Sequence, residues 1–256
     1  MGTGKNLLLI IDAQYDFCNE KGSLFVPGAV EDMDCLASFI KNNITSIDHI
    51  VLSQDSHQVI DISHPAFWRD KSGKYPNPFT SISAEEVESG EWTPLYEKDR
   101  VIKYLKQLHQ QGEFPHLIWP EHCIDGTLGA SIVDNVMDEV KKWSRESQQY
   151  FTVIQKGQNP LTEHFGLLRA NIPDENDIST QENKKLLDLF SQCSKLYVAG
   201  EAKSHCVANT IKQILPYKVI TDKLVIIKNC MSPVTGYEYI ADYIYEQLAP
   251  NQFIEV

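Results

Sequence analysis

The stretch KLYVAGEAKSHCVANTIKQIL, residues 195–215, contains the pattern that decides the fold. Its apolar run KLYVAGE stops near a glycine, and a helical spacing of apolar residues begins a few positions later. A short, continuous apolar run of this kind indicates a parallel strand that is buried on both faces. Cys206 lies where the helical pattern begins, so the segment places a cysteine just beyond the carboxyl end of a strand.

The same alternation of strand and helix runs along the chain. Similar apolar runs occupy 7–12, 49–55, 150–157 and 223–229, and FIEV at the end of the sequence is a candidate sixth strand. Helical patterns lie between these runs at about 30–43, 129–146, 181–193, 205–215 and 236–248. This order predicts a three-layer α/β/α fold with a mostly parallel central sheet.

One long segment interrupts the alternation. Residues 58–116 are rich in proline and aromatic residues, as in HPAFW and KYPNPFT, and one helix is expected there at about 98–111. A chain of 256 residues suits one large α/β domain. We therefore expect a single domain over residues 1–256, with an insertion at about 58–116 between the second and third strands.

Composition limits the partners. The chain has 35 acidic and 23 basic residues and a net charge of -12, and such an acidic surface repels nucleic acid. The apolar run near the N-terminus is too short for a signal peptide or a membrane span. Six cysteines without a C-x-x-C pair fit a reducing compartment. We expect a cytoplasmic protein with a small-molecule substrate and no membrane or nucleic-acid partner.

Residues capable of catalysis follow the predicted strands, where sites form in open α/β sheets. A cysteine at a helix N-terminus, as Cys206 is, has a lowered pKa that favours the thiolate, and nearby N–H groups can bind an oxyanion. The alternative for Cys206 is a small buried hydrophobic residue. Asp12 could transfer a proton or cap a turn. Lys156 could stabilise the charges of a Cys206 thiolate and of the Asp12 carboxylate, or it could lie at the surface as an ordinary lysine.

A second group has the composition of a metal site. Asp55 and His57 follow the second strand, His64 lies shortly after them, and His122 belongs to WPEHC. One aspartate with two or three histidines is typical of zinc, iron or manganese sites. Structural or solvent-facing roles fit His49, His109, His116 and His164, although His116 is close enough to the site region for a role there to stay open.

Five segments together resemble a known family. LLIIDAQYDFCNEKGSLFVPGA, SQDSH, WPEHCIDGTLGA, QKG and VAGEAKSHCVANT occur in the order found in isochorismatase-like cysteine hydrolases, and within them the nicotinamidases. The segments spread over nearly the whole chain. The resemblance implies the isochorismatase-like hydrolase fold. It also implies hydrolysis of nicotinamide to nicotinate and ammonia through a cysteine thioester, as a step of NAD salvage.

The resemblance also assigns roles to residues. It implies a catalytic triad of Asp12, Lys156 and Cys206. It further implies a divalent metal ion, zinc or alternatively iron or manganese, which holds the pyridine nitrogen of the substrate directly or through water. The implied ligands are Asp55, His57 and His122, with His64 as a fourth.

Further features follow from the same resemblance. Phe17 and Trp119 match the aromatic residues that flank the substrate ring. A cis peptide is implied between Glu201 and Ala202, and the backbone N–H groups of Ala202 and Cys206 would form the oxyanion hole. Relatives are often dimers or larger, so a homo-oligomer is implied as well.

Some positions depart from the family pattern. Ser56 replaces the usual tryptophan between Asp55 and His57, His64 is displaced by one residue, and Ser204 stands where the family has an acid. Two alternatives to a nicotinamidase therefore remain open. One is a related cysteine hydrolase acting on another carboxamide or on a carbamoyl or ureido group. The other is a non-catalytic binding protein with this fold.

Overall fold

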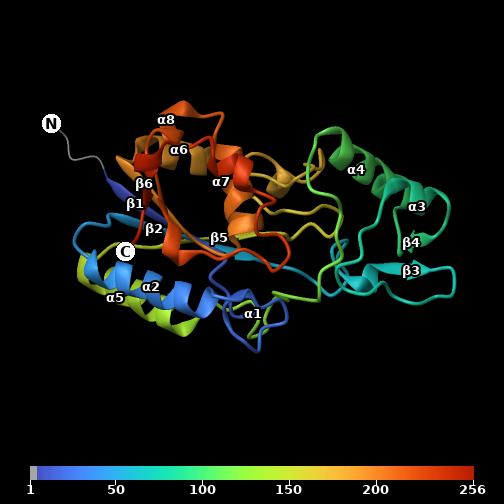
Figure 1. Ribbon diagram of the computed structural model, residues 1–256, viewed down its shortest axis with the longest axis horizontal. Coiled ribbons are helices and arrows are strands. Elements are labelled where there is room, and N and C mark those ends of the chain that lie inside the picture. Colours follow the sequence, from blue (N-terminus) through green and yellow to red (C-terminus); the bar gives the residue numbers. More distant parts are fainter. Residues whose placement is uncertain (1–4) are drawn as a thin grey trace.

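The computed structural model, which describes residues 5–256, contains a six-stranded parallel sheet (Figure 1). Each apolar run that predicted a strand forms one, and the three-layer α/β/α prediction is confirmed. In spatial order, the strands are β5 (Thr152–Lys156), β2 (His49–Asp55), β1 (Asn6–Ile11), β6 (Lys195–Gly200), β7 (Leu224–Ile227) and β8 (Phe253–Ile254).

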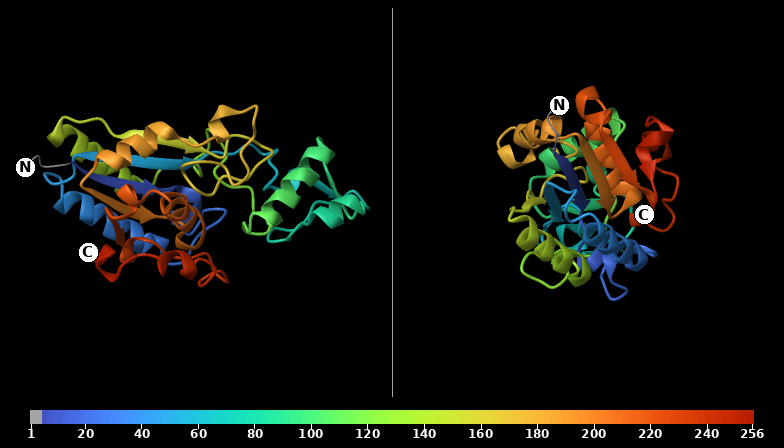
Figure 2. Two further views of the ribbon diagram at one scale, coloured as in Figure 1. Left: turned by 90° about the horizontal axis from the view of Figure 1, so that it is seen from above. Right: turned by 90° about the vertical axis from the view of Figure 1, so that its left-hand side faces the viewer.

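Helices cover both faces of this sheet (Figures 1 and 2). Leu8 and Ile10 point to one face and Leu7 and Leu9 to the other, because successive side chains of a strand alternate. The first face packs against α2 (Ala29–Asn42) and α5 (Asp134–Ser147). The second face packs against α6 (Lys184–Gln192), α7 (Ala208–Ile214), α8 (Lys218–Thr221) and α9 (Asp242–Tyr245).

The strand order determines where the candidate site residues lie in the sheet. The chain runs from β1 through β2 to β5 on one side and then returns to β6 on the other side of β1. The order therefore reverses between β1 and β6, and binding crevices of open α/β sheets lie at such a point. Asp12 directly follows β1, and Cys206 lies in the turn η3 (Lys203–Val207) between β6 and α7.

The segment 58–116 projects beyond one end of the sheet as a small lobe (Figures 1 and 2). Its elements are a 3-10 turn η1 (Pro65–Phe67), β3 (Trp68–Asp70), α3 (Ala84–Glu88), β4 (Trp92–Pro94) and α4 (Lys98–Gln110). β3 and β4 form an antiparallel ribbon, and the expected helix at 98–111 is α4. Leu161 and Ile172 pack into the lobe's hydrophobic cluster, which joins it to the rest of the chain.

Two predicted helices are shorter than their patterns suggested. The 129–146 helix begins only at Asp134, because Gly129 and Ser131 accept backbone hydrogen bonds from Asp16 and Tyr15 of α1 (Tyr15–Cys18). The 236–248 helix is reduced to α9, because i to i+3 turns replace the helical bonds before it. The remaining short elements are η2 (Ile178–Thr180), η4 (Lys228–Cys230) and η5 (Pro250–Gln252). Within residues 5–256, no helix is both long and apolar enough to cross a bilayer.

Gly200 tests the close packing of β1 and β6. It pairs with Ile11, its φ is 116°, and a Cβ there would overlap the carbonyl oxygen of Ile11. We expect Gly200→Ala to destabilise the fold by about 4 kcal/mol or more. The control is Gly236→Ala, where φ is also positive but no atom lies within 4 Å, so only about 1–2 kcal/mol should be lost. Equal melting temperatures for the two variants by circular dichroism would contradict this packing.

Candidate active site

Lys156 is the centre of the charged cluster at the carboxyl edge of the sheet. Its Nζ lies 2.9 Å from Asp12 Oδ2, 3.1 Å from Asp55 Oδ1 and 3.6 Å from Cys206 Sγ. The residue is 2% exposed, so this ammonium is a buried charge and not a surface lysine. The ends of β1, β2 and β5 and the turn after β6 thus converge on one nitrogen atom.

Asp12 is held in place by the neighbouring strand. It is fully buried with φ at 43°, a left-handed conformation that non-glycine residues adopt mainly where the surroundings impose it. Its N–H donates to Ser53 Oγ at 3.0 Å, and the Ser53 hydroxyl donates to Asp12 Oδ1 at 2.5 Å. Burial raises the pKa of Asp12, Lys156 opposes that shift, and Asp55 adds to it. The carboxylate is therefore a better proton acceptor than an exposed aspartate.

The structure corrects the expected thiolate at Cys206. Burial raises the pKa of the Cys206 thiol well above its ordinary value; Lys156 lowers it, while Asp12 and Asp55 raise it further. The sequence placed Cys206 at a helix start but could not show two carboxylates beside it. In this arrangement the residue is a neutral thiol that lies close to the carboxylates of Asp12 and Asp55.

Lys156 and Asp55 stabilise each other's charged forms. Burial alone would lower the pKa of Lys156, but Asp12 and Asp55 raise it well above its ordinary value. Burial would raise the pKa of Asp55, but Lys156 and His57 hold it well below the usual range. Lys156 is therefore cationic and Asp55 anionic at neutral pH.

Asp55, His57 and His122 come together as a group that could hold a metal ion. His57 Nε2 lies 3.2 Å and His122 Nε2 lies 3.6 Å from Asp55 Oδ2. The Nδ1 of His57 faces Asp61 Oδ2 at 3.1 Å, which leaves Nε2 turned toward the group. That Nε2 is buried and has no hydrogen-bond partner among residues 5–256. An unpartnered imidazole nitrogen beside a carboxylate and a second imidazole fits a divalent cation.

His64 lies beside this group but not within it. Its Nε2 is 3.2 Å from Nδ1 of His122, and its Nδ1 is 3.0 Å from the carbonyl oxygen of Gln58. Burial lowers the pKa of His64 to about 3, with His122 and His57 adding to the shift. In this arrangement His64 contacts a candidate ligand residue instead of completing the ligand set.

The two predicted ring-flanking residues border the cluster from different sides. Phe17 meets His122 edge-on with ring centroids 5.5 Å apart. Trp119 meets His205, the residue before Cys206, at 5.1 Å, and Phe165 and Tyr237 also pack against His205. The peptide between Glu201 and Ala202 is cis, as the resemblance implied.

Several residues of this region were missed or misjudged from the sequence. Ser53, a polar residue inside an apolar strand, and Asp61, four residues after His57, carried signals that could have been read. His164 was expected to be structural or solvent-facing, yet it is buried with an unpartnered Nε2. Burial raises the pKa of the adjacent Glu163 to about 8, while His57 lowers it. No sequence pattern marks the loop that carries Glu163 and His164.

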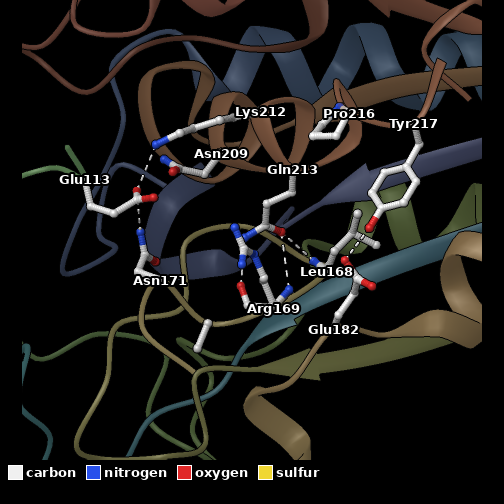
Figure 3. Close-up of a pocket in the computed structure, with 11 residues that line it drawn as sticks. Glu113, Leu168, Arg169, Asn171, Glu182, Asn209, Lys212, Gln213, Pro216 and Tyr217 are labelled. Atoms are coloured by element: carbon white, nitrogen blue, oxygen red, sulfur yellow. Dashed lines mark hydrogen bonds and ion pairs between the residues drawn. The ribbon is translucent and has the colours of Figure 1, made fainter. Parts of the chain in front are cut away.

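A separate surface cavity of about 330 Å³ lies on α7 (Figure 3). Its polar groups already pair with one another: Lys212 binds Glu113 at 3.0 Å, and Gln213 donates to the carbonyl oxygen of Arg169 at 2.8 Å. None of the catalytic or metal candidates lines it. The contact between Glu113 and Lys212 fastens the end of the inserted segment to the helix that follows Cys206.

Comparisons with known proteins identify relatives of this chain in sequence and in fold. No family model matches the chain. The sequence is 23% identical to the nicotinamidase of Saccharomyces cerevisiae over 203 residues, which are 79% of this chain and 78% of that relative. The structure of the yeast nicotinamidase Pnc1p bound to the inhibitor nicotinaldehyde matches with a TM-score of 0.66 and 18% identity, over 98% of this chain and 100% of that one.

A pyrazinamidase of Pyrococcus horikoshii, in complex with zinc, matches with a TM-score of 0.57 and 15% identity, over 98% of both chains. Sequence and fold together confirm the resemblance stated above. The chain has the isochorismatase-like hydrolase fold and is similar in sequence to a nicotinamidase over most of its length.

Removal of the central ammonium should be costly. In Lys156→Met, two buried carboxylates lose their shared cation, and we expect a loss of about 3–5 kcal/mol at pH 7. The control is Lys218→Met, whose side chain is 85% exposed and pairs with Asp222; it should change stability by about 0.5 kcal/mol or less. Urea unfolding measures both variants.

The deficit of Lys156→Met should also shrink as the pH falls. Without Lys156, the pKa values of Asp12 and Asp55 rise in the folded protein, so protonation relieves the two charges at mildly acidic pH. A deficit that is the same at pH 5 and pH 8 would contradict the placement of this ammonium between two carboxylates.

Proposed function

We propose that the chain is an amidohydrolase that converts nicotinamide to nicotinate and ammonia through a thioester on Cys206. The observation that carries the proposal is the contact of one buried ammonium, that of Lys156, with Asp12, Asp55 and Cys206. Such a cluster supplies a nucleophile, a proton acceptor and a fixed countercharge at one point. The similarity to yeast nicotinamidase in sequence and fold supports the choice of substrate.

In the first step, Asp12 takes the proton of the Cys206 thiol as the sulfur attacks the amide carbonyl. The raised pKa of Asp12 favours this transfer, and Lys156 stabilises the developing thiolate at 3.6 Å. The carbonyl oxygen becomes an oxyanion that the N–H groups of Ala202 and Cys206 would bind. Within residues 5–256, no protein acceptor is paired with the Ala202 N–H, so it is free to donate.

In the second step, Asp12 returns the proton to the leaving nitrogen, and ammonia departs from a thioester. A water molecule, deprotonated by the same carboxylate, then attacks the thioester carbonyl. Nicotinate leaves and the thiol is restored. The net reaction consumes one amide and one water and yields one acid and one ammonia, so the enzyme ends as it began.

Asp55, His57 and His122 would hold a divalent cation, for which zinc is the leading candidate and iron or manganese the alternatives. When bound, that cation would supply a Lewis-acidic point that fixes the pyridine nitrogen, directly or through water. The protein's own part is to orient the ligands: Asp61 fixes the ring of His57, and Phe17 packs against His122. Phe17 and Trp119 would flank the substrate ring.

We also propose that residues 1–256 act as one hydrolase domain with the lobe at 58–116 as an insertion. The shared hydrophobic cluster around Leu161 and Ile172 supports this reading. The returning end of the lobe carries Phe114, which packs against His205 at 5.5 Å next to the nucleophile. The lobe is therefore placed to shape the substrate pocket.

The direct test is ammonia release from nicotinamide by the metal-loaded protein. We expect turnover by the wild type and a loss of at least about 10⁴-fold in Cys206→Ala and about 10²-fold or more in Asp12→Asn. Cys193→Ala is the matched control, since this buried cysteine lies at the end of α6, and its activity should remain near that of the wild type.

Each failure has its own meaning. Full activity in both Cys206→Ala and Asp12→Asn would overturn the mechanism. Release from pyrazinamide or a ureido compound but not from nicotinamide would keep the mechanism and replace the substrate. If the metal-loaded wild type hydrolyses none of these amides, the non-catalytic alternative is favoured.

The metal proposal has an independent readout. Asp61→Asn removes the carboxylate that orients His57, and we expect zinc affinity to fall by about 10–100-fold in a chelator competition titration. Asp70→Asn, on the lobe and remote from the histidines, should leave the affinity unchanged. Equal affinities of wild type and Asp61→Asn would show that zinc is not bound through His57.

A further inference from the structure

A second pair of buried acids lies behind the nucleophile turn, outside the groups that the proposed reaction uses. Asp32 belongs to the first turn of α2, and Glu201 is the residue directly after β6. Glu201 is fully buried and Asp32 is 7% exposed. The two carboxyl groups lie next to each other and beside Ser232, whose N–H donates to Glu201 Oε2 at 3.1 Å.

This contact requires a proton. Asp32 Oδ2 and Glu201 Oε1 are both buried, and no donor among residues 5–256 reaches either of them. Two ionised carboxylates are acceptors only and repel each other, so a hydrogen bond between them needs one carboxyl O–H. A single shared proton satisfies both orphaned oxygens.

The surroundings place that proton on Glu201. Burial raises the pKa of Asp32, but the Ser232 hydroxyl and the Met231 N–H oppose that shift, and Asp32 lies at the positive end of α2, so it is the better site for the negative charge. Burial, followed by Asp32, raises the pKa of Glu201 well above its ordinary value. The Glu201 carboxyl therefore donates, and its Oε2 accepts from the Ser232 N–H at 3.1 Å.

The other titratable groups near Glu201 add no positive charge to this site. They are Cys18 of α1, Cys230 of η4 and Tyr245 of α9, and Glu201 contributes to raising the pKa of each. The nearby cation, Lys203, lies over the ring of Tyr245 at 5.5 Å. The neutral form of Glu201 is thus the form that this environment favours.

The pair is joined to the candidate oxyanion hole by the backbone. The Glu201 N–H donates to Ile11 O at 2.8 Å, and the Lys203 N–H donates to Ser232 O at 2.9 Å. Ala202 lies between these two anchors. The carboxyl pair therefore fixes the segment at Ser232 and the turn before Cys206 against each other.

We propose that Asp32 and Glu201 share one proton, and that this carboxyl pair is a positioning device that aims the Ala202 N–H at the carbonyl oxygen of the bound amide. The catalytic part of this inference rests on the proposed function. The proton sharing does not, and the two parts are tested separately.

The first test measures stability against pH. A glutamine at 201 keeps the shape, donates to Asp32 and accepts from the Ser232 N–H without needing a proton. Because the folded pKa of Glu201 is raised, the wild-type contribution is fully present below about pH 4.3 and is lost as the pH rises toward the folded pKa.

The melting temperature of Glu201→Gln should therefore gain on the wild type by roughly 3 °C per pH unit between about pH 5 and 8. The control is Glu246→Gln, which removes a charge from an exposed position. A difference between Glu201→Gln and wild type that does not change with pH, or that matches the control, overturns the shared proton.

The second test separates positioning from general stability. In Glu201→Ala we expect kcat for nicotinamide to fall by about 10–100-fold with KM changed less than about threefold, and Glu201→Gln should restore kcat to within about threefold of wild type. Nicotinaldehyde adds a probe: the Cys206 sulfur bonds to its carbonyl carbon, the C=O π bond opens, and the thiol proton passes to the oxygen. Its affinity should weaken in Glu201→Ala while that of nicotinate does not.

The outcomes stay distinguishable from failure of the proposed function. If the wild type hydrolyses no amide, the proposed function fails and the melting data alone decide the shared proton. If the wild type is active and both variants lose kcat equally, positioning by the neutral pair is overturned. Should Glu201→Ala not fold, Asp32→Ala replaces it, because it breaks the pair from the opposite side, and the same loss of kcat is expected.

Discussion

The burial of one ammonium between two carboxylates is the constraint on which the site depends. Charges removed from water are tolerated only when partners of opposite sign lie at hydrogen-bonding distance. Lys156 meets this condition because it is paired in register with Asp55 across β5 and β2, while Asp12 follows the next strand, β1. Only a parallel sheet in this order brings the three strand ends to one point.

The same cluster determines the protonation state of Cys206, the proposed nucleophile. Two negative groups and one positive group surround a buried thiol, so in the proposed mechanism Cys206 remains protonated until a substrate carbonyl can take up the charge. In that mechanism, reactivity arises from the neighbouring Asp12 carboxylate acting as a base, and not from a thiolate that is present before substrate binds. A neutral thiol is also less prone to oxidation than an exposed thiolate. In the proposed pair of Asp32 and Glu201, a carboxyl group is likewise kept neutral by burial, behind the turn that carries Cys206.

Much of the fold could be predicted from the sequence, since buried parallel strands are continuous apolar runs and their ends are marked by Asp12, Asp55 and Lys156. The prediction of a helix at 236–248 was wrong for most of that range, because consecutive turns bury the same apolar residues against the core as a helix would. The protonation of Cys206 could not be predicted, because it depends on burial and on carboxylates from other strands. Glu163, His164 and the pair Asp32–Glu201 meet only through tertiary packing, which no local pattern records.

The most direct test of the central claim is to trap the covalent intermediate. The metal-loaded protein would be mixed with nicotinamide, quenched in acid during turnover, digested and examined by mass spectrometry, with a parallel reaction in hydroxylamine. The expected result is a nicotinoyl group on the peptide that contains Cys206, together with diversion of product to the hydroxamate. An acyl group on another residue, or steady turnover with neither adduct nor hydroxamate, would contradict a thioester on Cys206.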